Sequence, residues 1–173
     1  ALYANLGYQI SESMSAQVGA RYEHATIGAD FNGIEIKRSY PNLFPSASFS
    51  WVIAPEYRMT ASYNRSISLP WVGLLNPRVN RETATSQFVG NPDIRPEFTH
   101  SVEINMSAFL GSHTVSIAPY FKRTTDEVQY NTQLVGDIMT SSYTNFSGSR
   151  SFGLSSSYSY RSRSGFTARM NMD

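Results

Sequence analysis

Apolar and polar residues alternate along nearly the whole chain. In the opening stretch, apolar residues at positions 2, 4, 6, 8 and 10 share one face of an extended chain, and mostly polar or small residues occupy the other. The same period of two recurs over residues 14–23, 46–53, 57–64, 98–110, 114–122, 151–160 and 166–172. Segments of roughly 10 residues are long enough to cross a bilayer as tilted strands. The pattern predicts an all-β protein, an antiparallel transmembrane β-barrel segment of about eight up-and-down strands.

The lengths of the connections between these segments favour a membrane barrel over a water-soluble one. Turns at residues 11–13, 54–56, 111–112 and 161–165 are tight, whereas the connections over residues 28–45, 67–96 and 131–142 are long. Short periplasmic turns at one end and long extracellular loops at the other are typical of outer-membrane barrels. Alternation alone also describes a soluble β-barrel whose apolar face lines a pocket, and that alternative stays open.

Aromatic residues are concentrated near both ends of the predicted strands. Those close to the short turns are Tyr8, Trp51, Tyr57, Tyr158, Tyr160 and Phe166; those nearer the long loops are Tyr22, Tyr63, Phe98 and Phe121. Two such belts match the interfacial girdles of a membrane barrel. The polar face carries charged residues in mid-strand, which we expect to face a wet or plugged lumen: Arg21, Glu23, Arg58, Glu103, Lys122 and Arg169.

Composition excludes several other classes. No stretch approaches the ~20 consecutive apolar residues of a transmembrane helix. The net charge of +1 gives no basic footprint for nucleic acid, and the absence of cysteine excludes a disulfide scaffold and a thiolate metal site. Both ends of the sequence fall within strand patterns, so we expect a mature or partial chain.

Several short motifs resemble those of TonB-dependent receptors. Residues 90–97 resemble the G-N-P-x-[IL]-x-P-E signature that leads into a strand in that family. The other matches, which occur in the family's order, are residues 19–23 with G-x-R-Y-E, 43–50 with the F-P-S strand entry, 61–70 with S-Y-S-R-R-I-x-x-P, 75–77 with L-N-P and 120–128 with F-Y-R-R-T-x-D-x-[IV]. Together they cover nearly the whole chain.

This resemblance implies a barrel of about 22 strands plugged by an N-terminal domain, which imports a ligand across the bacterial outer membrane. Residues 1–173 would then be one barrel-wall segment without the plug. The implied partners are outer-membrane lipid, the rest of the barrel, the plug domain and, through that plug, the inner-membrane TonB complex. A surface lipoprotein over the loops is a further candidate partner. The resemblance implies no cofactor and no nucleic-acid partner.

Two sets of residues are singled out. Gly90, Asn91, Pro92, Pro96 and Glu97 are expected to form a structural loop-to-strand junction, in which Gly90 permits a positive φ and the prolines hold the approach extended. Loop residues are frequent ligand contacts on a rigid scaffold. The candidates for ligand binding are Trp71, Asn76, Arg78, Asn80 and Arg81, for which loop packing is the alternative role.

No catalytic constellation is present in the sequence. The serine-rich strand at residues 155–157 has no G-x-S-x-G elbow or positioned base, so we do not expect an enzyme. The histidines His24, His100 and His113 lie on different strands, and no metal site is expected. The acidic pairs 93/97 and 126/127 are expected on a solvated rim. Two alternatives to the receptor remain: a small closed eight-stranded barrel with a structural or adhesion role, and a soluble barrel binding an apolar ligand.

Overall fold

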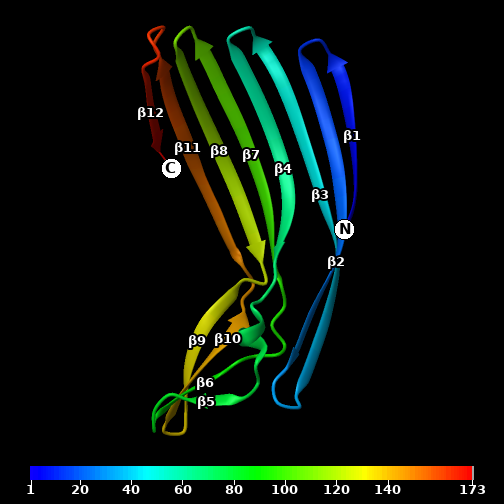
Figure 1. Ribbon diagram of the computed structural model, residues 1–173, viewed down its shortest axis with the longest axis vertical. Helices are drawn as coiled ribbons and strands as arrows, with labels where there is room; N and C mark the ends of the chain where they lie inside the picture. Colours follow the sequence, from blue (N-terminus) through cyan, green and yellow to red (C-terminus); the bar gives the residue numbers. More distant parts are fainter. Residues whose placement is uncertain (173) are drawn as a thin grey trace.

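The computed structural model describes residues 1–172 and consists almost entirely of antiparallel strands. Eight of them form one curved sheet in the order β1-β2-β3-β4-β7-β8-β11-β12 (Figure 1). Their bounds are β1 Leu2–Ser11, β2 Met14–Asp30, β3 Glu35–Ala54, β4 Tyr57–Ser68, β7 Glu97–Leu110, β8 His113–Thr125, β11 Ser149–Arg161 and β12 Thr167–Met172. The predicted number of up-and-down strands is therefore confirmed. Within residues 1–172, no helix is long and apolar enough to span a membrane.

The strand register gives the sheet one apolar and one polar face. One row across six neighbouring strands runs Val18, Ala47, Tyr63, Val102, Phe121 and Phe152, each paired with the next. The adjacent row on the opposite face includes Gly19, Ser46, Asn64, Ser101, Lys122 and Ser151. Because side chains alternate along a strand, a fixed register keeps each set on its own side. We call the apolar side the outer face and the polar side the inner face.

The four predicted tight turns all lie at one end of the sheet, at the top of Figure 1. The turn between β7 and β8 consists of Gly111 and Ser112 alone, and Gly111 has a φ of 63°. Two-residue hairpins of this kind need a positive φ, which glycine adopts without steric cost. Every predicted aromatic girdle residue that lies in a strand of this sheet belongs to the outer face.

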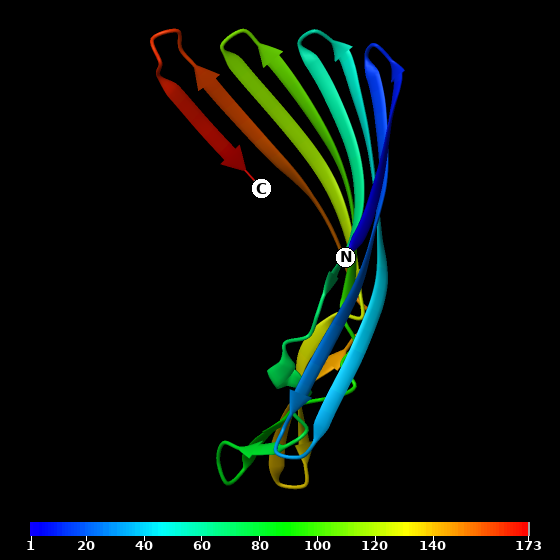
Figure 2. The ribbon, with the colours of Figure 1, turned by 45° about the vertical axis from the view of Figure 1, so that its right-hand side comes forward.

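At the other end, the prediction of a loop over residues 28–45 is wrong. β2 and β3 continue through it as a paired hairpin, from Tyr22 opposite Leu43 to Asp30 opposite Glu35. The sequence argues against this because Pro41 lies inside the segment, and a proline donates no ladder hydrogen bond. The hairpin projects beyond the other strands of the sheet (Figures 1 and 2).

The other two long connections also contain ordered structure, which the sequence pattern missed. They form a second sheet in the order β5-β6-β10-β9 and the 3₁₀ helix η1. The bounds are η1 Val72–Leu75, β5 Val79–Arg81, β6 Ser86–Val89, β9 Val128–Val135 and β10 Ile138–Asn145. β6 pairs in parallel with β10, so the two connections are joined by backbone hydrogen bonds. We call this sheet, η1 and the projecting β2–β3 hairpin the loop lobe.

The loop lobe has its own small hydrophobic core. Leu75 is fully buried, Ile94 is 2% exposed and Ile36 is 7% exposed. These three residues come from η1, from the segment before β7, and from the projecting hairpin, so one core joins three parts of the chain. Partly buried side chains complete it: Ile27, Phe31, Leu74, Val128 and Tyr143.

The sheet is open at both edges. β1 pairs only with β2, and β12 pairs only with β11, among the strands of residues 1–172. All residues of β1 and β12 are exposed. A small closed eight-stranded barrel requires β1 to pair with β12, so that alternative does not describe this structure.

Candidate functional site

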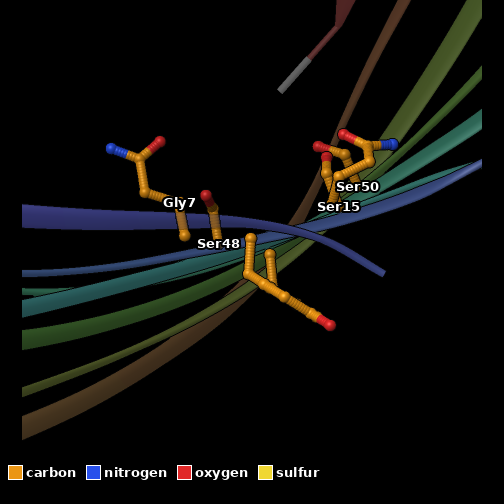
Figure 3. Close-up of a pocket in the computed structure, with 8 residues that line it drawn as sticks. Gly7, Ser15, Ser48 and Ser50 are labelled. Carbon is orange, nitrogen blue, oxygen red and sulfur yellow. The ribbon is translucent and has the colours of Figure 1, made fainter. Parts of the chain in front are cut away.

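The inner face of the sheet is a wall of small polar side chains interrupted by charged residues. Ser15 is paired with Ser50, and Gln17 with Ser48. Figure 3 shows Ser15, Ser48 and Ser50 projecting from the same side of the sheet, around a shallow hollow of about 350 Å³ beside β1. The hollow is open and lies beside the edge strand of the sheet, so it is part of the wall rather than a formed ligand pocket.

Three cations of the inner face, Arg21, Arg58 and Lys122, lie against aromatic rings. The guanidinium carbon of Arg21 is 5.1 Å from the ring centre of Phe44, and its Nη1 is 3.3 Å from the carboxylate of Glu23. The ammonium of Lys122 lies 5.0 Å from the ring of Tyr120. These contacts hold the charges along the wall, where they remain partly exposed. The sequence prediction that these residues share the polar face is confirmed for Arg21, Arg58, Glu103, Lys122 and Arg169, and Glu23 follows the same alternation in β2.

Glycine allows an aromatic side chain to lie flat against the inner face. A Cβ on Gly153 would be 2.5 Å from the ring of Tyr120, its cross-strand partner. The ring therefore occupies the space above the glycine. A larger residue at this position would displace Tyr120 and, with it, the Lys122 contact.

In the loop lobe, residues 90–97 connect three parts of the chain. The backbone N–H of Asn91 donates to Leu74 O at 2.7 Å, and its side-chain amide donates to Tyr143 O at 3.1 Å. On the third side, Arg38 Nη2 is 3.3 Å from both Pro92 O and the Asp93 carboxylate. η1, β10 and the projecting hairpin are thus each bonded to this segment.

Gly90 has a different role from the expected one. Its φ is not in the left-handed region, so the positive φ that glycine permits is not adopted here. A Cβ at Gly90 would lie 2.5 Å from Asn76 O and 2.6 Å from Leu74 O. Glycine is required here because two backbone segments approach each other too closely for any side chain.

Asn145 and Glu97 fix the end of this segment. The Asn145 side chain accepts from Arg95 N at 2.8 Å, and donates to Arg95 O at 2.9 Å and Asp126 O at 2.7 Å. The Glu97 carboxylate accepts from Val128 N at 2.7 Å, and Arg95 pairs with Asp126 at 2.6 Å. Glu97 and Asp126 therefore make specific contacts within the lobe, unlike the solvated rim expected from the sequence. Asp93 remains 85% exposed.

The five predicted ligand-binding residues lie in one stretch of the loop lobe. Trp71 precedes η1 and is 73% exposed, with its ring across Gly73. Asn76 follows η1, and its side-chain oxygen accepts from the backbone N–H of Arg78 at 3.1 Å. Asn80 and Arg81 are exposed residues of β5, with Asn80 paired to Phe88 and Arg81 to Gln87. Asn76 and Arg78 are brought into direct contact; Trp71 makes no hydrogen bond with the other four among the described residues.

The histidines are bound to neighbours on separate strands. His100 Nδ1 is 2.9 Å from the Tyr63 hydroxyl, and His113 Nδ1 is 2.8 Å from that of Tyr158. His24 Nε2 is 2.6 Å from the Ser39 hydroxyl. Each ring therefore has a protein partner, and the three do not converge. Elsewhere in the lobe, burial raises the pKa of Tyr40, and the nearby positive charge of Arg38 partly offsets that rise.

Comparison with solved structures relates this sheet to receptor barrels. The hemophore receptor HasR of Serratia marcescens superposes with a TM-score of 0.75 at 14% identity, over 92% of this chain and 31% of that one. The siderophore receptor PirA from Pseudomonas aeruginosa superposes with a TM-score of 0.75 at 13% identity, over 98% of this chain and 32% of that one. The copper transporter OprC superposes with a TM-score of 0.70 at 14% identity, over 98% of this chain and 27% of that one. The chain spans about a third of the length of these proteins, which are receptors or transporters rather than enzymes.

The family match extends over the whole sequence. No curated protein gives a significant match. A family model described as the outer membrane protein beta-barrel family matches residues 1–173, which places the chain in the bacterial outer membrane and overturns the soluble-barrel alternative. The chain belongs to the outer membrane protein beta-barrel family.

Proposed function

We propose that this chain forms part of the barrel wall of a TonB-dependent receptor that imports a ligand across the outer membrane. The observation that carries the proposal is the open, eight-stranded sheet that superposes on about a third of three receptor chains. Unpaired backbone groups are very costly in hydrocarbon, so a membrane-embedded sheet needs further strands at both edges. The rest of a larger barrel would supply them.

The inner face is suited to enclosing a folded plug domain. Its serine and glutamine side chains offer hydrogen-bond donors and acceptors, and its charges are held against aromatic rings. A plug would bury this wall and would contact the inner-membrane TonB complex, which supplies the energy for transport. Both partners are implied by the resemblance to TonB-dependent receptors.

The loop lobe would form part of the ligand vestibule. Trp71, Asn76, Arg78, Asn80 and Arg81 are the proposed contacts, since Trp71, Arg78 and the two β5 residues are exposed on a lobe with a fixed core. Residues 90–97 are proposed as the junction that holds this lobe on the barrel. Heme, copper and siderophores appear with the structurally similar receptors, so a metal or metal-bearing small molecule is the proposed ligand class. A surface lipoprotein over the lobe remains a candidate partner.

Uptake measurements in the bacterium that makes this protein test the proposal. Radiolabelled heme, copper(II) and a ferric siderophore serve as probes in the parent strain and in a deletion strain, with and without a proton-motive-force uncoupler. We expect uptake of one probe to fall about tenfold on deletion and equally on uncoupling. Unchanged uptake of all three probes, or uptake that the uncoupler does not affect, would contradict the proposal.

The two tryptophans of the chain provide a test variant and a matched control variant for ligand binding in the vestibule. Trp71→Ala removes an exposed aromatic surface from the loop lobe, whereas Trp51→Ala removes a ring from the outer face of β3. We expect the first variant to raise the ligand concentration needed for half-maximal uptake, and the second to leave it unchanged. Equal effects would show that Trp71 acts only through packing.

A further inference from the structure

Four neighbouring strands each place an arginine or histidine side chain at the same level of the outer face. Arg65 in β4 is paired with His100 in β7, His100 with Arg123 in β8, and Arg123 with Arg150 in β11. All four belong to the face that carries Tyr63, Val102 and the other apolar residues. We call this set the arginine row.

The arginine row has no acidic counterpart on the outer face of its own four strands. β4, β8 and β11 contain no aspartate or glutamate, and the two glutamates of β7 belong to the inner face. The three ion pairs among the described residues lie elsewhere. Directly paired residues have Cβ atoms about 5 Å apart, and like charges at that spacing destabilise a sheet. An anion from outside the chain would remove this repulsion.

The position of the row along the strands corresponds to the edge of the membrane. It follows immediately after the row of Tyr63, Val102, Phe121 and Phe152, in which Phe152 is 87% exposed. Beyond the arginine row, the paired apolar residues on the outer face of these four strands are Ile67 and Phe98. His100 lies about 33 Å along β7 from the short turn, at ~3.3 Å per residue, which is roughly 25 Å along the membrane normal for a strand tilted by ~40°. This distance equals the height of the apolar band of a transmembrane barrel, ~25 Å.

The side chains of the row are held in place by their neighbours. Arg65 Nη1 donates to Leu43 O at 3.0 Å, and its guanidinium lies 4.3 Å from the ring centre of Phe98. His100 is fixed by the 2.9 Å hydrogen bond to Tyr63. Arg123 and Arg150 are exposed and make no hydrogen bond or ion pair through their side chains among the described residues. The row therefore combines one anchored guanidinium with two whose donors are unused.

We propose that the arginine row binds the phosphate groups of a membrane glycolipid in the outer leaflet. Guanidinium groups bind phosphate through paired, charge-assisted hydrogen bonds. From Arg65 to Arg150 the row covers three strand spacings, about 14 Å, which suits a headgroup with more than one phosphate. The lipid tails would lie on the apolar residues directly below. The inference depends on the outer-membrane location and is independent of the transported ligand.

Binding of purified diphosphoryl lipid A to the full-length protein in detergent provides the test. The variant is Arg123→Gln with Arg150→Gln; the matched control is Lys122→Gln with Arg58→Gln, which removes two charges from the inner face of neighbouring strands. We expect the variant to bind lipid A about tenfold more weakly, through loss of charge-assisted hydrogen bonds. The control should bind within twofold of the parent protein, and binding should weaken as salt is raised.

Three results would overturn the proposal. The first is an equal loss of lipid A affinity in the variant and the control, and the second is binding of zwitterionic phosphatidylcholine as tightly as lipid A. The third is displacement of lipid A by inorganic phosphate at matching phosphate concentration. The last would indicate a site for free phosphate. Heat-modifiable gel migration reports whether each variant is folded. If the double variant does not fold, Arg150→Gln alone, at the exposed start of β11, should still weaken lipid A binding severalfold, and an unchanged affinity would contradict the inference.

Discussion

Substitution of Leu75 by alanine should loosen the loop lobe without affecting the barrel sheet. Leu75 is fully buried at the end of η1, where it packs with Ile36 and Ile94. These residues come from three parts of the chain, so a cavity at their centre weakens the contacts that hold the lobe together. The eight strands of the main sheet have a separate hydrogen-bond ladder that does not depend on this core.

The expected magnitude follows from the burial of the side chain. Leucine-to-alanine changes at fully buried sites cost about 2–5 kcal/mol, because transfer energy is lost and a cavity remains. A value of about 3 kcal/mol corresponds to a roughly hundredfold increase in the population of open lobe. Leu134→Ala is the control: Leu134 is 71% exposed near the tip of the β9–β10 hairpin, and its replacement should cost less than about 0.5 kcal/mol.

Hydrogen exchange of the full-length protein in detergent measures this opening. The informative amides are those of Asn91, bonded to Leu74 O at 2.7 Å, and Ile94, bonded to Asn91 O at 3.3 Å. We expect exchange in residues 86–97 to accelerate roughly hundredfold in Leu75→Ala and to change little in Leu134→Ala. The reasoning would be refuted if both variants behaved alike, or if β7 and β8 exchanged faster to the same degree as the lobe.

Three further substitutions test other parts of the structure. Gly148→Ala should lower the melting temperature, because the residue has a φ of 120° and an added Cβ would clash with the backbone oxygen of Thr124. The control Gly28→Ala should leave the melting temperature unchanged, because a Cβ there meets nothing within 4 Å. Asn145→Ala removes three side-chain hydrogen bonds and should speed proteolysis within residues 91–97; an unchanged cleavage rate would count against the junction. Ile104→Arg on the outer face should reduce the free energy of folding into lipid vesicles by about 2–4 kcal/mol, whereas Asn105→Arg on the inner face should have little effect. Equal losses would show that the faces are misassigned.

The alternation of residues was sufficient to predict the eight strands of the main sheet, apart from the continuation of β2 and β3 through residues 28–45. Because a strand has a period of two, the apolar residues of each segment define its outer face, and register follows from pairing like faces. The shared outer face of the aromatic residues followed from the same pattern, since they alternate with polar residues along their strands. The arginine row was less evident: its successive members are separated by 23 to 35 positions in sequence, and only the register brings them side by side.

The loop lobe could not be predicted in the same way. Two of its strands are short, with three residues in β5 and four in β6, so they carry too little alternation to recognise. The β6–β10 pairing is parallel and joins two distant connections, which no local signal indicates. At Gly90 the residue type pointed correctly to a special backbone requirement, but the requirement is close approach of η1 rather than a left-handed φ.

The intact mass of the native polypeptide, purified from detergent-solubilised outer membrane, tests the central claim most directly. The two open sheet edges and the superposition on 27 to 32% of two receptor chains and one transporter chain predict a mass roughly three times the 19.3 kDa of these residues. A mass close to 19.3 kDa would contradict the account, because β1 and β12 would then have to find their partners within these 173 residues or in a second copy.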